Sequence, residues 1–243
     1  MTYNPWPLGR LPKEFQRPEP EMIRDKYPWD DPRDIIDIFE KKVAKFAGSN
    51  YAVATDSCSH AIFLCLRMLD VFYNRHRVDI SIPYHTYISV PHQIYHAKYG
   101  ICLNDVIGLQ KWAGVYNLNP TRIWDAALRW TKGMYIKDSL MCLSFQIKKR
   151  IPIGRGGMIL CNNETEYWWL KLASYDGREL NTPYDSKGHA KMIGYHYYMT
   201  PEDAARGIIL MDKTPEVNED QGGWENYPDI RDVYRPLRWL QHR

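Results

Sequence analysis

The stretch "YAVATDSCSHAIFLCLRMLDVFY", residues 51–73, decides the fold class of this chain. Its first five residues form a short apolar run, and residues 59–73 repeat apolar side chains with a helical period. A buried strand that leads directly into a helix is the repeating unit of α/β domains. The stretch therefore predicts a strand, a polar turn and a helix that packs on the resulting sheet.

The same order of strand and helix recurs on both sides of this stretch. A helical pattern with an apolar stripe and a final glycine precedes it at residues 32–48, and "DISIPYH" (79–85) leads to "YISVPHQIYHAKYG" (87–100). Further strand candidates are "ICLND" (101–105), "RIWDAA" (122–127), "LMCLSF" (140–145) and "GMILCNN" (157–163). This alternation predicts an α/β domain with a mostly parallel sheet.

Composition divides the chain into three parts. Residues 1–33 are rich in proline and aromatic side chains without a period, and we interpret them as an extended N-terminal arm. Residues 34–213 carry the strand and helix patterns and form the large domain, whose last helix has Thr200 as its cap. Residues 214–243 are interrupted by proline and glycine and are expected to form a short C-terminal tail.

Charge and cysteine usage narrow the class of protein. A formal net charge of +3 with scattered Lys and Arg argues against nucleic acid as a partner. The five cysteines lie far apart without a CxxC pair, which favours reduced thiols over disulfides or a zinc site. The sequence shows neither a signal-peptide pattern nor an apolar run of membrane-spanning length, so we expect a soluble, cytoplasmic protein without a membrane partner.

Polar side chains follow the predicted strands at the edge where an open parallel sheet binds ligands. In the opening stretch, the backbone N–H groups of the helix start and two hydroxyls favour a phosphate, and N-capping by Ser57 or Ser59 is the structural alternative. Tyr87 could stack on a flat ring. Asp125 ends an apolar strand, so its carboxylate pairs either with a structural cation or with a cationic group of a ligand.

The segment "SFQIKKRIPIGRGGMIL", residues 144–160, places two adjacent lysines before a glycine cluster. A Walker phosphate loop has its lysine after the glycines, so that interpretation fails on order. A solvated basic turn and a reactive amine are both compatible with this segment alone. A phosphate site, an aromatic ring, a buried carboxylate and a lysine at successive strand ends together fit pyridoxal 5'-phosphate, which needs all four.

Several motifs in the correct order resemble the DegT/StrS family of pyridoxal-phosphate-dependent sugar aminotransferases. The family patterns F-E-x-x-F-A-x-x-x-G, S-G-T, P-S-aromatic-T-aromatic, E-D-A-A and S-F-x-x-x-K…G-x-G-G appear as "FEKKVAKFAG" (39–48), "SCS" (57–59), "PYHTY" (83–87), "WDAA" (124–127) and "SFQIKKRIPIGRGG" (144–157). The similarity extends over residues 38–210, most of the chain.

This resemblance implies a fold and an activity. The fold would be that of the large domain of fold-type-I transferases, a three-layer α/β/α domain with a mostly parallel sheet of about seven strands. The activity would be that of an aminotransferase, which moves an amino group from an amino-acid donor to a keto acceptor. The acceptor would be a keto-sugar nucleotide, a small keto acid or an aldehyde. The resemblance also implies a homodimer with shared active sites.

The family register assigns roles to single residues. Family members place the lysine that binds the cofactor five residues after the Ser and five before the first Gly, and counts from Ser144 and Gly154 both give Lys149. Lys149 would hold pyridoxal phosphate as an internal aldimine and act as general acid and base. Asp125 would pair with the ring nitrogen, and Tyr87 would stack on the ring. The residues expected around the phosphate are Ser57, Cys58, Ser59 and Ser144.

The chain departs from the family pattern in four ways. Cys58 replaces a glycine, so the phosphate site requires a negative φ at that position. Leu128 replaces a Gln or His beside the ring's phenolic oxygen. His196 replaces an Asn that reaches the neighbouring subunit's phosphate, and Tyr198 replaces an Arg. The C-terminal small domain is essentially missing, so we expect substrate recognition by the large domain, the N-terminal arm and the dimer partner.

Three other classes of protein fit parts of the pattern. A non-catalytic cofactor-binding or regulatory homologue has no need of Lys149 or Asp125, yet both are present. A dehydratase of the same family would carry His in place of the lysine. A metal site built from His85, His92 and His96 has no acidic third ligand nearby, so we predict no metal site.

Overall fold

The computed structural model of the chain describes residues 12–74, 78–103, 111–180, 182 and 186–233. The helices are η1 Lys13–Phe15, α1 Glu19–Ile23, α2 Asp34–Ala47, α3 Cys58–Tyr73, α4 Ser89–His96, α5 Glu164–Ser174, α6 Pro201–Lys213, η2 Trp224–Asn226 and α7 Ile230–Val233. The strands are β1 Tyr51–Thr55, β2 Asp79–Ile82, β3 Gly100–Leu103, β4 Tyr116–Asn117, β5 Ile123–Asp125, β6 Leu140–Ser144 and β7 Gly157–Cys161. Residues 51–73 form β1, a turn and α3, which confirms the α/β class predicted from them.

The described strands form two sheets instead of one mostly parallel sheet of about seven strands. The order in the larger sheet is β1-β7-β6-β5-β4, where only β5 and β6 pair in parallel, and β2 pairs with β3 in parallel. Connections without a helix reverse the chain between β4 and β5 and between β6 and β7, and such connections give antiparallel neighbours. The predicted, mostly parallel arrangement is therefore wrong. It was based on the patterns of the strands alone and did not consider whether a helix connects each strand to the next.

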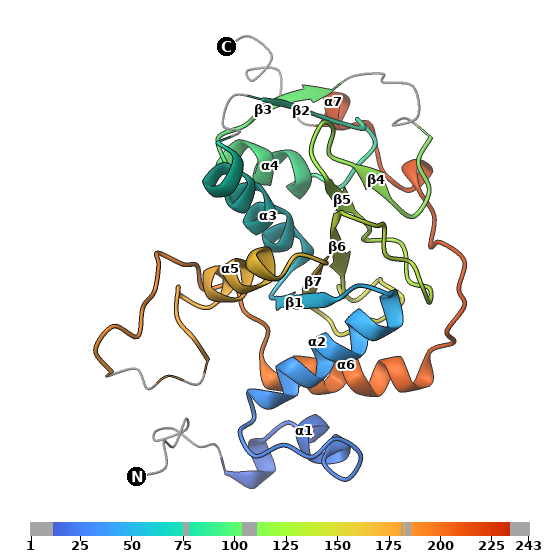
Figure 1. Ribbon diagram of the computed structural model, residues 1–243. Coiled ribbons are helices and arrows are strands. Elements are labelled where there is room, and N and C mark those ends of the chain that lie inside the picture. The colour runs from blue at the N-terminus through green and yellow to red at the C-terminus, as the bar shows by residue number, and fades with distance from the viewer. Residues whose placement is uncertain (1–11, 75–77, 104–110, 181, 183–185, 234–243) are drawn as a thin grey trace.

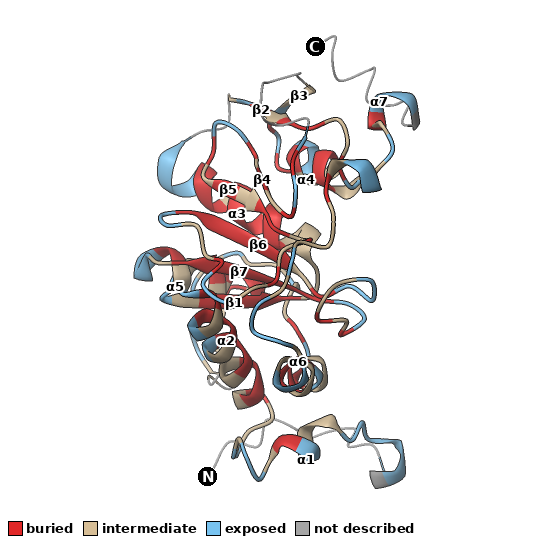
Figure 2. Ribbon diagram, turned by 90° about the vertical axis from the view of Figure 1, so that its right-hand side faces the viewer, coloured by how far each residue is buried: buried red, intermediate tan, exposed pale blue. Residues whose placement is uncertain are grey.

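Helices cover both faces of the larger sheet, as expected for three layers (Figure 1). Along β6, Leu140 and Cys142 face the core beneath α3, while Met141 and Leu143 face the core beneath α2 and α6. Buried residues accordingly concentrate in the sheet between the helices (Figure 2). Burial on both faces makes such strands continuous apolar runs, which is why their sequence pattern was readable.

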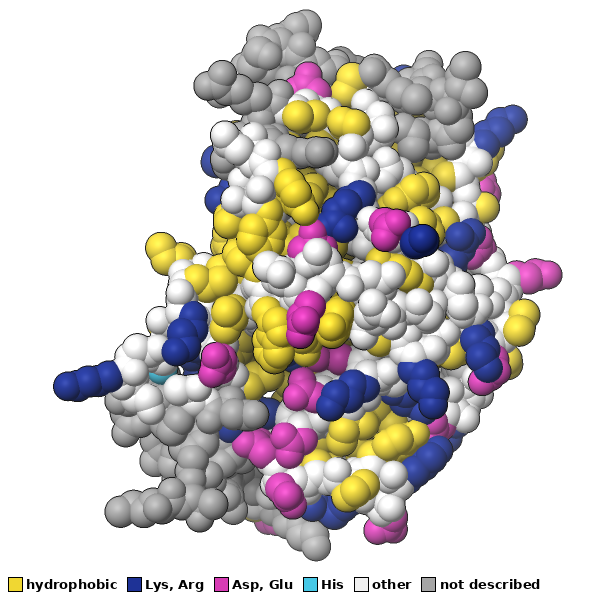
Figure 3. Space-filling view, in the orientation of Figure 1, with side chains coloured by type: hydrophobic (Ala, Val, Ile, Leu, Met, Phe, Trp, Pro, Cys, Tyr) yellow, Lys and Arg dark blue, Asp and Glu magenta, His cyan; other side chains and the backbone are white. Residues whose placement is uncertain are grey.

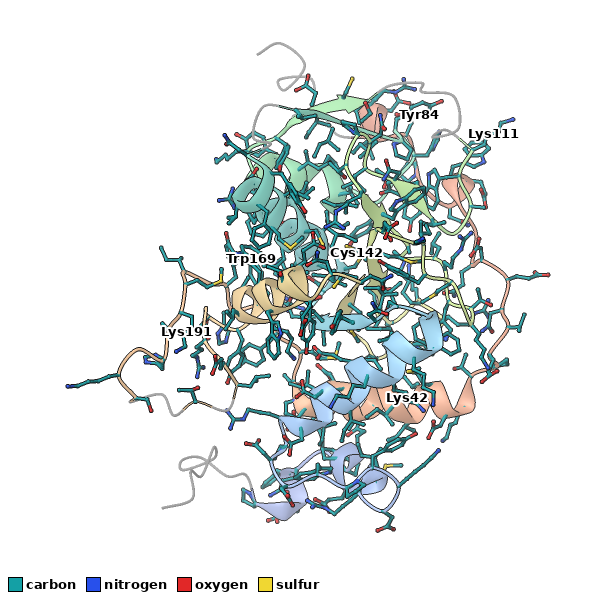
Figure 4. The ribbon with its side chains drawn as sticks, in the orientation of Figure 1. Lys42, Tyr84, Lys111, Cys142, Trp169 and Lys191 are labelled. Carbon is teal, nitrogen blue, oxygen red and sulfur yellow. The ribbon has the colours of Figure 1, made fainter. Side chains whose placement is uncertain are left out.

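Side chains of the sheet contribute to the core on each of its faces. Cys142 projects from β6 toward α3, where its sulfur lies 3.8 Å from that of Cys65 (Figure 4). All five cysteines are free thiols. The two sheets are linked by two backbone hydrogen bonds between Ser81 and Asn119, at 2.7 and 3.1 Å.

The described part of the N-terminal segment packs on α6. Residues 12–33, treated above as part of an extended arm, contain η1 and α1, and α1 lies against α6 at the end of the domain far from β2 and β3 (Figure 1). Arg17 pairs with Asp203 at 2.7 Å, and Lys26 pairs with Asp212 at 2.7 Å. Within the described residues, this segment therefore covers the outer side of α6.

The surface has no single charged field on the side seen in Figure 3. Lys and Arg side chains are spread among acidic ones there, as their scatter in the sequence predicts. None of the helices in the described part of the chain combines the length and apolar character needed to cross a bilayer. The same residues contain no cluster of three or more His, Cys, Asp or Glu side chains able to hold a metal ion.

A buried ion pair joins α2, β1 and α5. The Glu40 carboxylate, in a residue only 4% exposed, accepts hydrogen bonds from the Ala54 N–H at 2.7 Å and from the Lys171 ammonium at 2.8 Å. Lys171 also binds Asp37 at 3.0 Å. Burial raises the pKa of Glu40 to about 7. A carboxylate in this position depends on its cationic partner, because an unpaired buried charge is strongly unfavourable.

Lys171→Met is expected to lower the free energy of unfolding at pH 8 by about 3–5 kcal/mol, since it leaves the Glu40 charge buried and unpaired. The folded-state pKa of Glu40 lies above its unfolded value, so the loss should shrink as the pH falls and Glu40 takes up a proton. Urea unfolding at pH 5 and pH 8 measures both effects. Lys132→Met, which removes an exposed pair with Glu216, is the control and should cost at most about 1 kcal/mol.

Candidate functional site

The carboxyl ends of β1, β5 and β6 meet at one edge of the larger sheet, because the three strands run in the same direction. Thr55, Asp125 and Ser144 end these strands. The first turn of α3 follows β1, and the loop with the two lysines follows β6. The edge predicted from the sequence as a ligand site therefore gathers residues from three separate parts of the chain.

The first turn of α3 has the geometry expected of an anion-binding helix start. Ser57 has extended backbone angles and its hydroxyl accepts a hydrogen bond from the His60 N–H at 3.2 Å, so it is the N-cap. Ser59 Oγ lies 2.6 Å from Ser89 Oγ at the start of α4. Cys58 is the first helical residue and its φ is negative, so a side chain is tolerated where the family has glycine.

An acidic side chain with a basic partner and two stacked rings surround this turn. The Asp56 carboxylate accepts from Arg155 Nη2 at 2.8 Å and lies 2.6 Å from His60 Nδ1. The His60 ring stacks on Tyr197, with ring centroids 3.7 Å apart. Arg155 can therefore offset the negative charge of Asp56 beside a bound anion. Sequence reasoning missed Arg155 and His60, although Arg155 lies inside the G-x-G-G motif.

Glycines bring the start of β7 against the start of α3. Gly154 and Gly156 have φ values of +124° and +151°, which side chains rarely adopt. A Cβ at Gly157 would lie 2.4 Å from the carbonyl carbon of Ser57. The glycine cluster therefore allows the close turn behind the site that its sequence predicts.

Asp125 is held in place by two hydrogen bonds. It is 6% exposed; its Oδ2 accepts from the Tyr116 hydroxyl at 2.9 Å and its Oδ1 from the Ala127 N–H at 2.9 Å. The Tyr116 hydroxyl in turn contacts Thr86 Oγ1. Burial raises the pKa of Asp125, whereas both hydrogen bonds and the charge of Lys149 counteract that rise. No structural cation is hydrogen-bonded to the carboxylate among the described residues, which favours the ligand role over the structural one.

The two adjacent lysines differ in their surroundings. Lys149 is half-buried, and burial lowers the pKa of its amine although the charge of Asp125 opposes the shift. Lys148 is exposed, and its backbone N–H donates to the Gln146 side chain at 2.8 Å. The structure thus brings Lys149, and not its neighbour, close to Asp125. A lowered amine pKa is the property needed for covalent binding of an aldehyde.

Two further predicted residues lie at the same edge. Ser144 is half-buried at the end of β6, and its Oγ accepts from the Gln146 N–H at 3.4 Å. Tyr87 is 59% exposed, and its ring meets that of Tyr227 edge-on with centroids 6.5 Å apart. Both side chains are therefore available to a ligand at this edge.

His196 lies apart from this group within its own chain. Its side chain is 69% exposed, and Nδ1 lies 3.1 Å from the Asp176 carboxylate. The neighbouring Tyr197 instead faces α3, since its ring stacks on that of His60 with centroids 3.7 Å apart. In extended backbone, successive side chains point in opposite directions, so only one of the two can face α3. The role of His196 toward a neighbouring subunit stays a prediction.

The structure adds Tyr116, Thr86 and Tyr227 to the residues found from sequence. Thr86 lies inside the recognised "PYHTY" motif, which was its only signal. Tyr116 belongs to a two-residue strand and Tyr227 to the tail, and neither follows a periodic pattern. A layered α/β domain with a lysine and a buried carboxylate at its sheet edge is the arrangement that the resemblance to fold-type-I transferases implies.

The family model of the DegT/DnrJ/EryC1/StrS aminotransferases matches residues 28–126 and 131–226. The chain belongs to this family. No curated protein matches the sequence significantly. The recognised resemblance is thereby confirmed, and the match also extends beyond the range over which the motifs were read.

Solved structures share the fold at low sequence identity. AtS13 from Actinomadura melliaura superposes with a TM-score of 0.65 at 17% identity, covering 80% of this chain and 63% of that one. The sugar aminotransferase CalS13 from Micromonospora echinospora gives 0.63 at 13%, covering 74% and 60%. Spr1654 from Streptococcus pneumoniae in its PLP form gives 0.61 at 17%, covering 86% and 67%. The chain spans roughly 60% of the length of the first two.

Proposed function

We propose that this protein is a pyridoxal-phosphate-dependent aminotransferase that transfers an amino group from an amino-acid donor to a keto acceptor. The observation that carries the proposal is that the half-buried Lys149 follows β6 and the buried Asp125 ends the parallel β5, so that both lie at the carboxyl edge of the sheet within electrostatic range of each other. Family membership and the fold shared with sugar aminotransferases support it. A keto-sugar nucleotide or a small keto acid or aldehyde would be the acceptor.

The residues present fit the cofactor. The first turn of α3, capped by Ser57, would hold the phosphate together with Cys58, Ser59 and Ser144. Arg155 beside this turn supplies positive charge. When bound, pyridoxal phosphate supplies an electron sink for the Cα proton loss of the amino donor.

Lys149 and Asp125 have separate tasks in this proposal. Asp125, whose ionised form is favoured by the hydrogen bonds from Tyr116 and Ala127, would hold the protonated ring nitrogen. Lys149 would bind the cofactor covalently and then carry a proton from and to the substrate Cα. The lowered pKa of its amine favours the neutral form that this proton transfer requires.

The assembly proposed with this function is a homodimer with shared sites. His196 is exposed on its own chain and available to a second copy. An imidazole there can donate a hydrogen bond to phosphate. Its contribution from the partner subunit follows from the family resemblance.

An absorbance spectrum tests the proposed function. Purified protein with pyridoxal phosphate is expected to show the visible band of a lysine-bound cofactor, and this band should bleach when an amino donor such as glutamate is added. A stable band that no amino acid bleaches would favour the non-catalytic cofactor-binding homologue. The absence of any bound cofactor would refute both.

A further inference from the structure

The chain after α6 returns to the carboxyl edge of the larger sheet. From the end of α6 it runs along the side of the domain to η2 and α7, near β2 and β4 (Figure 1). The described residues 12–33 pack on α6, away from this edge. The C-terminal segment Glu216–Ile230, and not the described part of the N-terminal arm, therefore reaches the candidate site.

This segment is fastened to three loops at the site edge. Arg129, in the loop after β5, binds the Asp220 carboxylate through Nε at 2.9 Å and Nη2 at 2.6 Å, a bidentate geometry that fixes both side chains. Backbone hydrogen bonds join Gln221 N to Leu128 O (2.9 Å), Gly114 N to Gly222 O (2.9 Å), Trp224 N to Trp112 O (3.1 Å) and Ile230 N to Tyr84 O (2.9 Å). Contacts distributed over the loops near β2, β4 and β5 hold the segment across the edge.

Tyr227 is the residue of this segment that faces the site. Its ring stacks on Trp112 with centroids 5.7 Å apart and an interplanar angle of 28°, and it meets Tyr87 edge-on. The Trp112 ring in turn lies 4.8 Å from that of Tyr116, whose hydroxyl donates to Asp125. A continuous aromatic contact therefore connects the segment to the carboxylate at the centre of the site.

The hydroxyl of Tyr227 is suited to donate a hydrogen bond. Burial raises its pKa, and the negative charge of Asp125 raises it further, so the phenol stays protonated at neutral pH. A protonated phenol surrounded by apolar rings gains most from a partner that brings its own acceptor. A ligand held between Asp125 and Lys149 would supply such an acceptor.

We propose that the segment Glu216–Ile230 is the second wall of the cofactor site and that Tyr227 is its cofactor-binding residue. This inference rests on the function proposed above. In this arrangement the chain encloses its ligand with a short strap of its own.

Two measurements on Tyr227→Ala, Tyr227→Phe and wild type test the wall. The first is the dissociation constant of pyridoxal phosphate, followed by absorbance. We expect Tyr227→Ala to weaken binding by about tenfold or more, and Tyr227→Phe, which loses only the hydroxyl, by about fivefold. The second is the alkylation rate of Cys58 in cofactor-free protein, followed by peptide mass. Tyr227→Ala should raise this rate by about tenfold, because Cys58 and Tyr227 pack against the same core and the proposed wall would shield Cys58 from the reagent.

Two further variants serve as controls. Asp220→Ala removes the ion pair between the segment and Arg129 outside the site. It should raise the dissociation constant of pyridoxal phosphate and the alkylation rate of Cys58 by smaller factors than Tyr227→Ala. Tyr95→Ala removes a tyrosine that is 47% exposed on α4, and it should change neither. Thermal unfolding of each variant identifies any that fails to fold.

The outcomes distinguish a failure of the proposed wall from a failure of the proposed function. Equal cofactor affinity and equal Cys58 alkylation in wild type and Tyr227→Ala would overturn the wall. Tighter binding by Tyr227→Ala would also overturn it, because the ring would then occupy the place of the cofactor. A wild-type protein that binds no pyridoxal phosphate would instead contradict the proposed function, and the alkylation rates would still report where the segment lies.

Discussion

Replacing Lys149 with alanine is expected to abolish the borohydride-reducible link between the protein and pyridoxal phosphate and to reduce transamination by on the order of 10³-fold or more. The reason is that Lys149 is the half-buried amine within electrostatic range of Asp125, whereas its neighbour Lys148 is exposed. Reduction with borohydride followed by peptide mass mapping measures the link directly.

Lys148→Ala is the matched control for this experiment. Lys148 is exposed and only one residue away, so its removal tests the general effect of losing a positive charge from the loop. It should leave the reducible link intact and turnover within a few-fold of wild type. An adduct mapped to Lys148 would mean that the assigned register is wrong by one residue.

Asp125→Asn is expected to lower transamination by roughly 10²–10³-fold, because a neutral amide no longer holds the ring nitrogen protonated. The fold should persist. The Asn oxygen can still accept from the Ala127 N–H, and its amide group can donate to the Tyr116 oxygen, so no buried polar group loses its partner. Steady-state turnover and thermal unfolding of the same preparation separate the two effects.

Near-normal turnover of this variant, with a normal melting temperature, would show that the carboxylate is structural and that the cofactor binds elsewhere. Tyr116→Phe provides an intermediate case. It keeps the charge of Asp125 but removes one hydrogen bond that favours the ionised form. Its cofactor affinity should therefore fall between those of wild type and Asp125→Asn.

The fold was readable from sequence where one element carried its own pattern. The run of residues 51–73 gave β1 and α3, since an apolar strand buried on both faces and a helix with a core-facing stripe each repeat their signal over several residues. Strand direction was not readable in the same way. It depends on whether the connection contains a crossover helix, and the lysine loop between β6 and β7 contains none.

The residues of the site also differ in whether a local sequence pattern predicts them. Lys149 and Asp125 were found because they lie in ordered motifs with fixed spacing, and the structure brings them together. Tyr116 and Tyr227 come from an isolated two-residue strand and from an irregular tail. Tyr116 matters through its hydrogen bonds with Asp125 and Thr86, and Tyr227 through ring contacts with Tyr87 and Trp112 in a distant part of the chain. No local pattern encodes these contacts. The contribution of the N-terminal arm to substrate recognition stays a prediction.

Gly157 has a consequence for how the sheet chooses its pairing. It stands opposite Ser144 in the ladder of β6 and β7, and its missing side chain admits the backbone of Ser57. If β7 slid by one residue so that Met158 took this place, a long side chain would strike the first turn of α3. A slide in the other direction would turn every apolar side chain of β7 toward the opposite core. The lack of a side chain at Gly157 therefore restricts the register in which β7 pairs in the sheet. This pairing also fixes where the loop that carries Lys149 begins and ends.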